Sequence, residues 1–251
     1  MEDPIQRPTP LLRWRGALLK LESLLPSGSV DDRAVGIFAQ LPRETRAALA
    51  ASATGAIAAA GWARRHGIAL TVALYGAASQ EMLEVLRLWG AQFERFATRE
   101  EALRRAHALG GELLPPLDGP KAVVHLSRTL GEEVLRDVSS PPTVVVAPAG
   151  ASAALLGTVH ALRTRWPKVR AIALTAADKE LPELPREDEF PGAETRAISF
   201  SEASRARSDL ARSAGVLASH AAAAAAAVAG EGGLAIVTAA GEREFSLERT
   251  A

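Results

Sequence analysis

LKLESLLPSGSVDDR, residues 19–33, determines how this chain is expected to fold. Apolar residues alternate over residues 17–22, which predicts a β-strand. Pro-Ser-Gly-Ser follows as a turn, and Ser29 is suited to cap a helix because its hydroxyl can accept from free backbone N–H groups. Asp31 and Asp32 then occupy the first helical turn, where acids stabilise the helix dipole. The segment therefore predicts a strand–turn–helix unit.

This segment resembles the lysine-bearing turn of pyridoxal-phosphate (PLP) enzymes in the tryptophan synthase β and cysteine synthase superfamily. The matching residues are Lys20, Leu21, Glu22, Pro26, Gly28, Ser29, Asp32 and Arg33. In that family a lysine precedes the Asp-Arg pair and forms the Schiff base with the cofactor. Here the position is Asp31, and a carboxylate cannot condense with an aldehyde as an amine does.

The rest of the chain offers few replacements for that lysine. Its four lysines are Lys20, Lys121, Lys168 and Lys179, so no shift of register brings one to the position of Asp31. We favour the simple interpretation of Asp31 and Asp32 as helix N-terminal residues over a catalytic role, because acids commonly occupy that place.

Predicted strands and helices alternate along the chain, which indicates parallel sheets covered by helices. Strands are expected at residues 47–51, 68–74, 93–96, 143–147, 169–175 and 234–238, and a surface loop at residues 176–196. The resemblance implies a two-domain, fold type II PLP-enzyme-like α/β protein with three α/β/α layers and mostly parallel sheets. It places residues 1–35 plus 112–251 in a large domain and residues 36–111 in an inserted small domain.

A small-residue turn before a predicted helix resembles the family's Ser-Gly-Asn-Thr-Gly loop, which holds the substrate carboxylate. The corresponding residues are Ser52, Ala53, Thr54 and Gly55. The resemblance implies a carboxylate or ligand cleft there, since a helix N-terminus offers N–H groups to anions. The asparagine that contacts the cofactor in the family is replaced by Ala53.

Two other cofactor contacts of the family are also altered. The glycine-rich phosphate cradle, Gly-Thr-Gly-Gly-Thr in the family, corresponds to Gly150, Ala151, Ser152, Ala153 and Ala154. The two extra β-carbons narrow a loop in which glycines let the backbone approach a phosphate closely. The serine that meets the cofactor's ring nitrogen falls in an alanine run at residues 221–223.

These four changes together predict a cysteine synthase-like pseudoenzyme with no catalytic residue and no cofactor, PLP being the ancestral one. We expect a non-catalytic binding, scaffold or regulatory protein, as a homodimer or as a heterodimer with an active paralogue. Its ligand would be a C-terminal peptide or an amino acid. Two alternatives stay open: a PLP-dependent lyase or transferase with an atypical active site, and an amino-acid sensor that closes on its ligand.

Composition excludes other classes of function. Lysine plus arginine equals aspartate plus glutamate at 29 each, which argues against nucleic-acid or acidic-membrane binding. There is no cysteine, and the five histidines show no spacing with acids that suggests a metal. The N-terminus has no secretory signal pattern, and the longest apolar run is too short to span a bilayer, so we expect a cytoplasmic protein.

Overall fold

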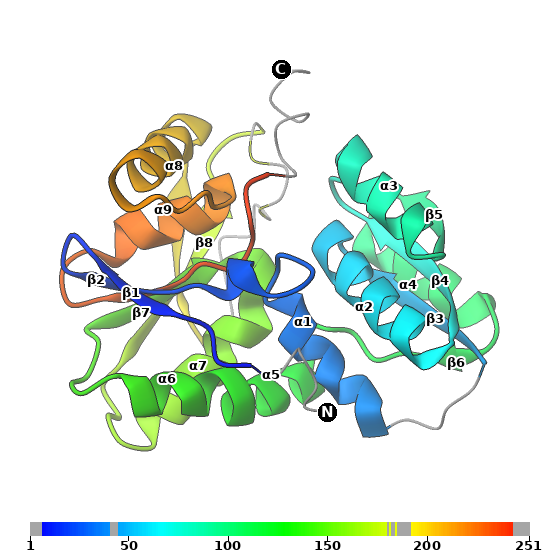
Figure 1. Ribbon diagram of the computed structural model, residues 1–251, viewed down its shortest axis with the longest axis horizontal. Helices are drawn as coiled ribbons and strands as arrows, with labels where there is room; N and C mark the ends of the chain where they lie inside the picture. The colour runs from blue at the N-terminus through cyan, green and yellow to red at the C-terminus, as the bar shows by residue number, and fades with distance from the viewer. Residues whose placement is uncertain (1–6, 41–44, 180, 182–183, 185–191, 243–251) are drawn as a thin grey trace.

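The computed structural model of the protein describes residues 7–40, 45–179, 181, 184 and 192–242. They form two lobes, each built on its own β-sheet (Figure 1). The six-stranded sheet has the order β1-β2-β10-β7-β8-β9, and the four-stranded sheet has the order β5-β4-β3-β6. Among the described strands only β1 and β2 pair antiparallel. The expected α/β class with mostly parallel sheets is confirmed.

The larger lobe has helices on both faces of its sheet. Its strands are β1 (Leu11–Trp14), β2 (Ala17–Lys20), β7 (Val144–Pro148), β8 (Arg170–Ala176), β9 (Glu194–Ile198) and β10 (Leu234–Ile236). Val145 and Ala147 of β7 enter the core under α7 (Ser152–Arg163), whereas Val144 and Val146 enter the core under α8 (Phe200–Ala214) and α9 (His220–Ala229). Successive strand residues face opposite sides, so this sheet is the middle of three layers.

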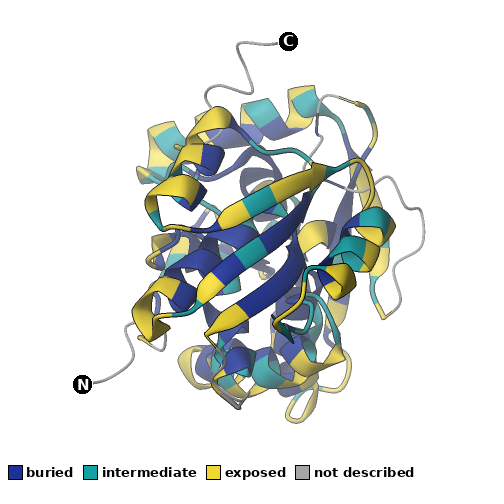
Figure 2. Ribbon diagram, turned by 90° about the vertical axis from the view of Figure 1, so that its right-hand side faces the viewer, coloured by how far each residue is buried: buried dark blue, intermediate teal, exposed yellow. Residues whose placement is uncertain are grey.

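The smaller lobe repeats this plan around β3 (Arg46–Ala51), β4 (Ala69–Tyr75), β5 (Gln92–Phe96) and β6 (Glu112–Leu113). One face is covered by α2 (Ala53–His66), with α3 (Gln80–Leu88) beside it, and the other by α4 (Arg99–Ala108). Figure 2 shows β5 largely exposed at the edge of this sheet and β3 and β4 buried inside it.

Two connections join the lobes. A short helix, α1 (Asp31–Ala34), and the 3-10 helix η3 (Val35–Gln40) lead from the larger lobe to the smaller one. The chain returns to α5 (Pro120–Leu126), a π-helical segment η4 (Ser127–Gly131) and α6 (Glu132–Asp137). Val35 of η3, Ile57 of α2 and Leu126 of α5 belong to one buried hydrophobic cluster, so the lobes are packed together across α1 and η3.

Most predicted strands and helices lie where the sequence pattern puts them, and the capping box at Thr98 and Glu101 is present. The expected surface loop at residues 176–196 is wrong at its end, because β9 begins at Glu194 and pairs with β8. Residues 180, 182–183 and 185–191 of that segment lie outside the described residues. The division into a large domain of residues 1–35 plus 112–251 and an inserted small domain of residues 36–111 stays a prediction. No helix in the described part of the chain is long and apolar enough to cross a membrane.

Candidate ligand-binding site

The parallel strands of the smaller sheet end at one edge, where ligands commonly bind in α/β proteins. Tyr75 ends β4, the segments that follow β3, β5 and β6 bring Thr54, Arg99 and Asp118 to the same edge, and α1 adds Asp31 from the larger lobe. We name these five residues the Asp31 cluster. The structure thus brings together Asp31 and Thr54, two of the residues that the sequence predicted for the site.

Asp31 is the first residue of α1, and its half-buried carboxylate is held by two hydroxyls. The Ser29 hydroxyl donates to Asp31 Oδ2 at 3.0 Å, and the Thr54 side chain also donates a hydrogen bond. Burial raises the pKa of Asp31 above its ordinary value, the two hydroxyls oppose that rise, and the nearby Asp118 adds to it. The carboxylate is therefore held in an environment that favours a proton or a cation beside it.

The N-terminus of α2 faces the same cluster through Thr54. Ser52 is the N-cap residue, and its side chain makes no capping hydrogen bond. The first backbone bond of the helix runs from the Ala56 N–H to the Ser52 carbonyl at 2.8 Å. The N–H groups of Ala53, Thr54 and Gly55 precede that bond, so the helix start can accept an anionic group.

Tyr75, Arg99 and Asp118 complete the cluster, and sequence reasoning missed all three. Arg99 Nε and Nη2 donate to the two carboxylate oxygens of Asp118 at 3.2 and 3.0 Å. Burial raises the pKa of Tyr75 to about 12, with a further contribution from Asp118, and Arg99 donates a hydrogen bond to the Tyr75 hydroxyl. All three residues end or follow a parallel strand, and that position was the one signal that could have identified them.

Lys20 is the lysine closest in sequence to Asp31, but its amine is engaged elsewhere. Its side chain is fully buried, ion-paired with Glu133, and Nζ donates to the Thr9 carbonyl at 2.7 Å. A second carboxylate, that of Asp137, lies 3.3 Å from Nζ. The other three lysines, Lys121, Lys168 and Lys179, are exposed.

Arg33 and Glu22 belong to the same buried ionic network. Arg33 Nε and Nη2 donate to the two oxygens of Glu22 at 2.6 and 3.0 Å, and Nη1 donates to Glu133 at 2.8 Å. Burial acts to raise the pKa of Glu133, but hydrogen bonds from Arg33 and Lys20 outweigh it and lower that pKa. Three of the residues that match the family's lysine-bearing turn therefore hold strand, turn and helix together.

The two other predicted segments lie on the larger sheet. Residues 149–151 form a 3-10 turn after β7, and α7 begins at Ser152, with the side chains of Ala153 and Ala154 buried. Residues 221–223 are buried under α8, where they pack in the hydrophobic core. Among the described residues, no hydrogen bond or ion pair that we observe joins either segment to Asp31.

A family model described as "Pyridoxal-phosphate dependent enzyme" matches residues 3–189, which is most of the chain. The chain belongs to this family. Among characterised members it is 31% identical over 190 residues to the human protein "Serine dehydratase-like", covering 69% of this chain and 57% of the relative. It is 28% identical over 181 residues to N-(2-amino-2-carboxyethyl)-L-glutamate synthase of Ralstonia nicotianae. That match covers 64% of this chain and 54% of the relative. The matched region thus spans a little over half the length of each relative.

Solved structures of the family share the whole fold. O-ureido-L-serine synthase superposes with a TM-score of 0.79 at 21% identity, covering 98% of this chain and 94% of that one. The O-acetylserine dependent cystathionine β-synthase of Helicobacter pylori gives a TM-score of 0.79 at 21% identity, covering 96% and 95%. Cysteine synthase of Entamoeba histolytica superposes with a TM-score of 0.77 at 18% identity, covering 96% of this chain and 88% of that one. These similarities establish a cysteine synthase-like, fold type II architecture.

Proposed function

We propose that this chain is a non-catalytic, ligand-binding member of the PLP-dependent enzyme family. The observation that carries the proposal is Asp31, a hydroxyl-bound carboxylate at the position that the motif assigns to the Schiff-base lysine. A Schiff base needs a free amine. Asp31 cannot supply one, and the amine of Lys20 is buried in ion pairs. The residues at this position therefore do not fit a covalently bound PLP.

The charges around Asp31 support an amino acid as the ligand. A carboxylate group at the N-terminus of α2 would accept from the N–H groups of residues 53–55. An ammonium group beside Asp31 would neutralise a partly buried carboxylate that makes no ion pair within the described part of the chain. A free amino acid carries both groups on one carbon. A peptide C-terminus carries only the carboxylate, so it matches half of this arrangement.

The test begins with the cofactor. Purified protein is incubated with PLP, reduced with borohydride and mapped by mass spectrometry, with Asp31→Lys as the comparison variant. We expect no stoichiometric adduct on the native chain at Lys20, Lys121, Lys168 or Lys179. A stoichiometric adduct on one of these lysines, together with a yellow native protein, would overturn the proposal. Thermal-shift assays with serine, O-acetylserine and cysteine then test binding of the ligand, which raises the melting temperature.

One observation favours a second candidate, an enzyme that uses Asp31 as an acid–base group. The raised pKa of Asp31 is typical of catalytic carboxyls, which are tuned toward the working pH. Turnover of serine or O-acetylserine, followed by proton NMR and lost in Asp31→Asn, would favour the enzyme. We further propose self-association or pairing with an active relative, which sedimentation analysis of the full chain tests.

A further inference from the structure

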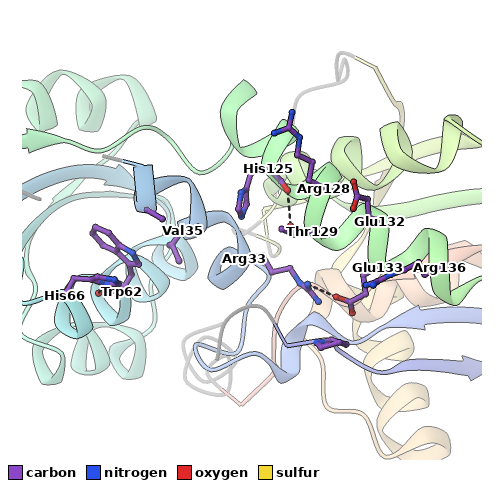
Figure 3. A pocket seen from close by; sticks show the side chains of 13 residues that line it. Arg33, Val35, Trp62, His66, His125, Arg128, Thr129, Glu132, Glu133 and Arg136 are labelled. Atoms are coloured by element: carbon purple, nitrogen blue, oxygen red, sulfur yellow. Dashed lines mark hydrogen bonds and ion pairs between the residues drawn. The ribbon is translucent and has the colours of Figure 1, made fainter. Parts of the chain in front are cut away.

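A cavity lies on the other side of α1 from Asp31. Residues two positions apart on an α-helix point about 200° apart, so Arg33 faces away from the Asp31 cluster and lines this cavity. The cavity encloses about 290 Å³ and is lined from both lobes. Figure 3 shows Trp62 and His66 of α2 on one side and His125, Arg128 and Glu133 on the other.

The wall on the α2 side is apolar and fixed. The indole of Trp62 is 6% exposed, with the ring of Phe38 at 5.1 Å edge-on and the ring of His66 stacked at 4.7 Å. Val35 is fully buried behind this wall, so the surface open to a ligand is the edge of Trp62 and the exposed ring of His66. A wall of this kind contacts the flat or aliphatic body of a ligand. The volume lies at the lower end of the range for small-molecule pockets, roughly 300 to 1,000 Å³.

The opposite wall carries an excess of positive charge. Glu133 is already neutralised, because Lys20 and Arg33 both pair with it. Arg128 and Arg136 line the same cavity, and neither makes an ion pair with a side chain in the described part of the chain. Glu132 between them is the one remaining acid of the lining, so two arginines face one carboxylate.

We propose that this cavity binds a small organic anion, a carboxylate or a phosphate monoester with an apolar body. The apolar body packs against the edge of Trp62 and the stacked ring of His66, and the anionic group lies at the rim formed by Arg128 and Arg136. The site is separate from the Asp31 cluster, and α1 is the wall that the two sites share. This cavity binds its anion whether or not the Asp31 cluster binds an amino acid.

Benzoate is the probe that tests the site, with benzyl alcohol as its uncharged counterpart, in calorimetric titrations of the full chain. We expect saturable binding of one benzoate and about tenfold weaker binding of benzyl alcohol. The double variant Arg128→Ala/Arg136→Ala should weaken benzoate binding by about tenfold or more. Arg212→Ala removes an exposed arginine on α8 and should leave the affinity within about twofold.

Three results would overturn the inference. The first is the absence of saturable benzoate binding. The second is binding that survives the double variant but disappears in Thr54→Ala, since benzoate would then lie at the N-terminus of α2. The third is a dimer, detected by sedimentation, that the double variant dissociates and benzoate does not affect, because a second copy of the chain would then fill the cavity.

Discussion

The surroundings of Asp31 disfavour the negative charge of its carboxylate. The family motif has a cation at this position, so its replacement by aspartate changes the local charge by two units. The carboxylate is half-buried, Asp118 lies nearby, and the hydroxyls of Ser29 and Thr54 compensate for part of the lost hydration. Such a group is costly to the fold, and a residue that costs stability is a candidate for function.

Asp31→Asn should therefore stabilise the protein near pH 7. The pKa of Asp31 is raised in the folded state, so its contribution to stability declines as pH rises from 3.8 through the folded-state pKa. Asparagine keeps the acceptor for Ser29 and Thr54 without the charge. Urea unfolding at pH 7 should show a higher free energy of unfolding for the variant, and the gain should vanish below pH 3.8. A loss of stability at pH 7 would instead support the plain helix-dipole role of Asp31.

Lys20 is the opposite case, a buried charge with every partner in place. Lys20→Met removes a cation that pairs with Glu133 and leaves that buried carboxylate with the Arg33 ion pair and the hydrogen bond from the Thr9 N–H. Removing one partner of a buried ion pair lowers the free energy of unfolding by about 3–5 kcal/mol, which urea unfolding measures directly. The matched control is Lys168→Met at an exposed lysine, which should change stability by less than about 0.5 kcal/mol. An effect as small as this at Lys20 would show that the Lys20–Glu133 ion pair does not stabilise the fold.

Elements differ in how far the sequence predicts them. β3 and β4 were predictable because they are short apolar runs of a buried parallel strand, and α4 because Thr98 and Glu101 form its capping box. β9 was not, since it lies at the edge of the sheet with only Ile198 buried, and it becomes a strand through its pairing with β8. The π-helical segment η4 also depends on tertiary packing, because Gly131 lies against Ala161 of α7.

The contact of η3 with α5 also depends on tertiary packing, and Gly36 is the residue that allows it. A β-carbon at Gly36 would lie 2.7 Å from Cε1 of His125, whose ring donates a hydrogen bond to the Arg33 carbonyl. Gly36→Ala should cost about 1–3 kcal/mol of stability, because the ring must move or the helix must shift. In a His125→Ala background the same change should cost less, with a coupling of about 1 kcal/mol in a double-mutant cycle of urea unfolding. Additive effects would show that His125 is not the obstacle.

The whole molecule places its candidate site where the two lobes meet. Asp31 and Thr54 were predictable from the order of motifs, because each follows a strand that the sequence pattern identifies. Tyr75, Arg99 and Asp118 were not, since their approach to Asp31 depends on how the smaller sheet packs on α1. The two lobes share one hydrophobic cluster, so a ligand that binds one lobe can change the position of the other.

An amino acid that bridges these lobes should raise the melting temperature of the protein. Alanine carries both charged groups, whereas propionate lacks the ammonium and ethylamine lacks the carboxylate. We expect alanine to stabilise the chain, by about 2.7 kcal/mol at a concentration one hundred times its dissociation constant, and the two fragments to have little effect. Thermal-shift titrations at matched ionic strength make the comparison.

The dependence of this binding on pH identifies its cause. The ammonium group binds the ionised form of Asp31, whose pKa is raised in the folded chain, so the affinity for alanine should fall as pH drops through that pKa. Asp31→Asn should remove this fall for alanine, whose own carboxyl stays ionised at acidic pH. At pH 7, where propionate is also ionised, Asp31→Asn should remove the preference for alanine over propionate. If alanine and propionate stabilise both chains equally, the ligand's amino group does not meet Asp31, and the two groups lie on different parts of the surface.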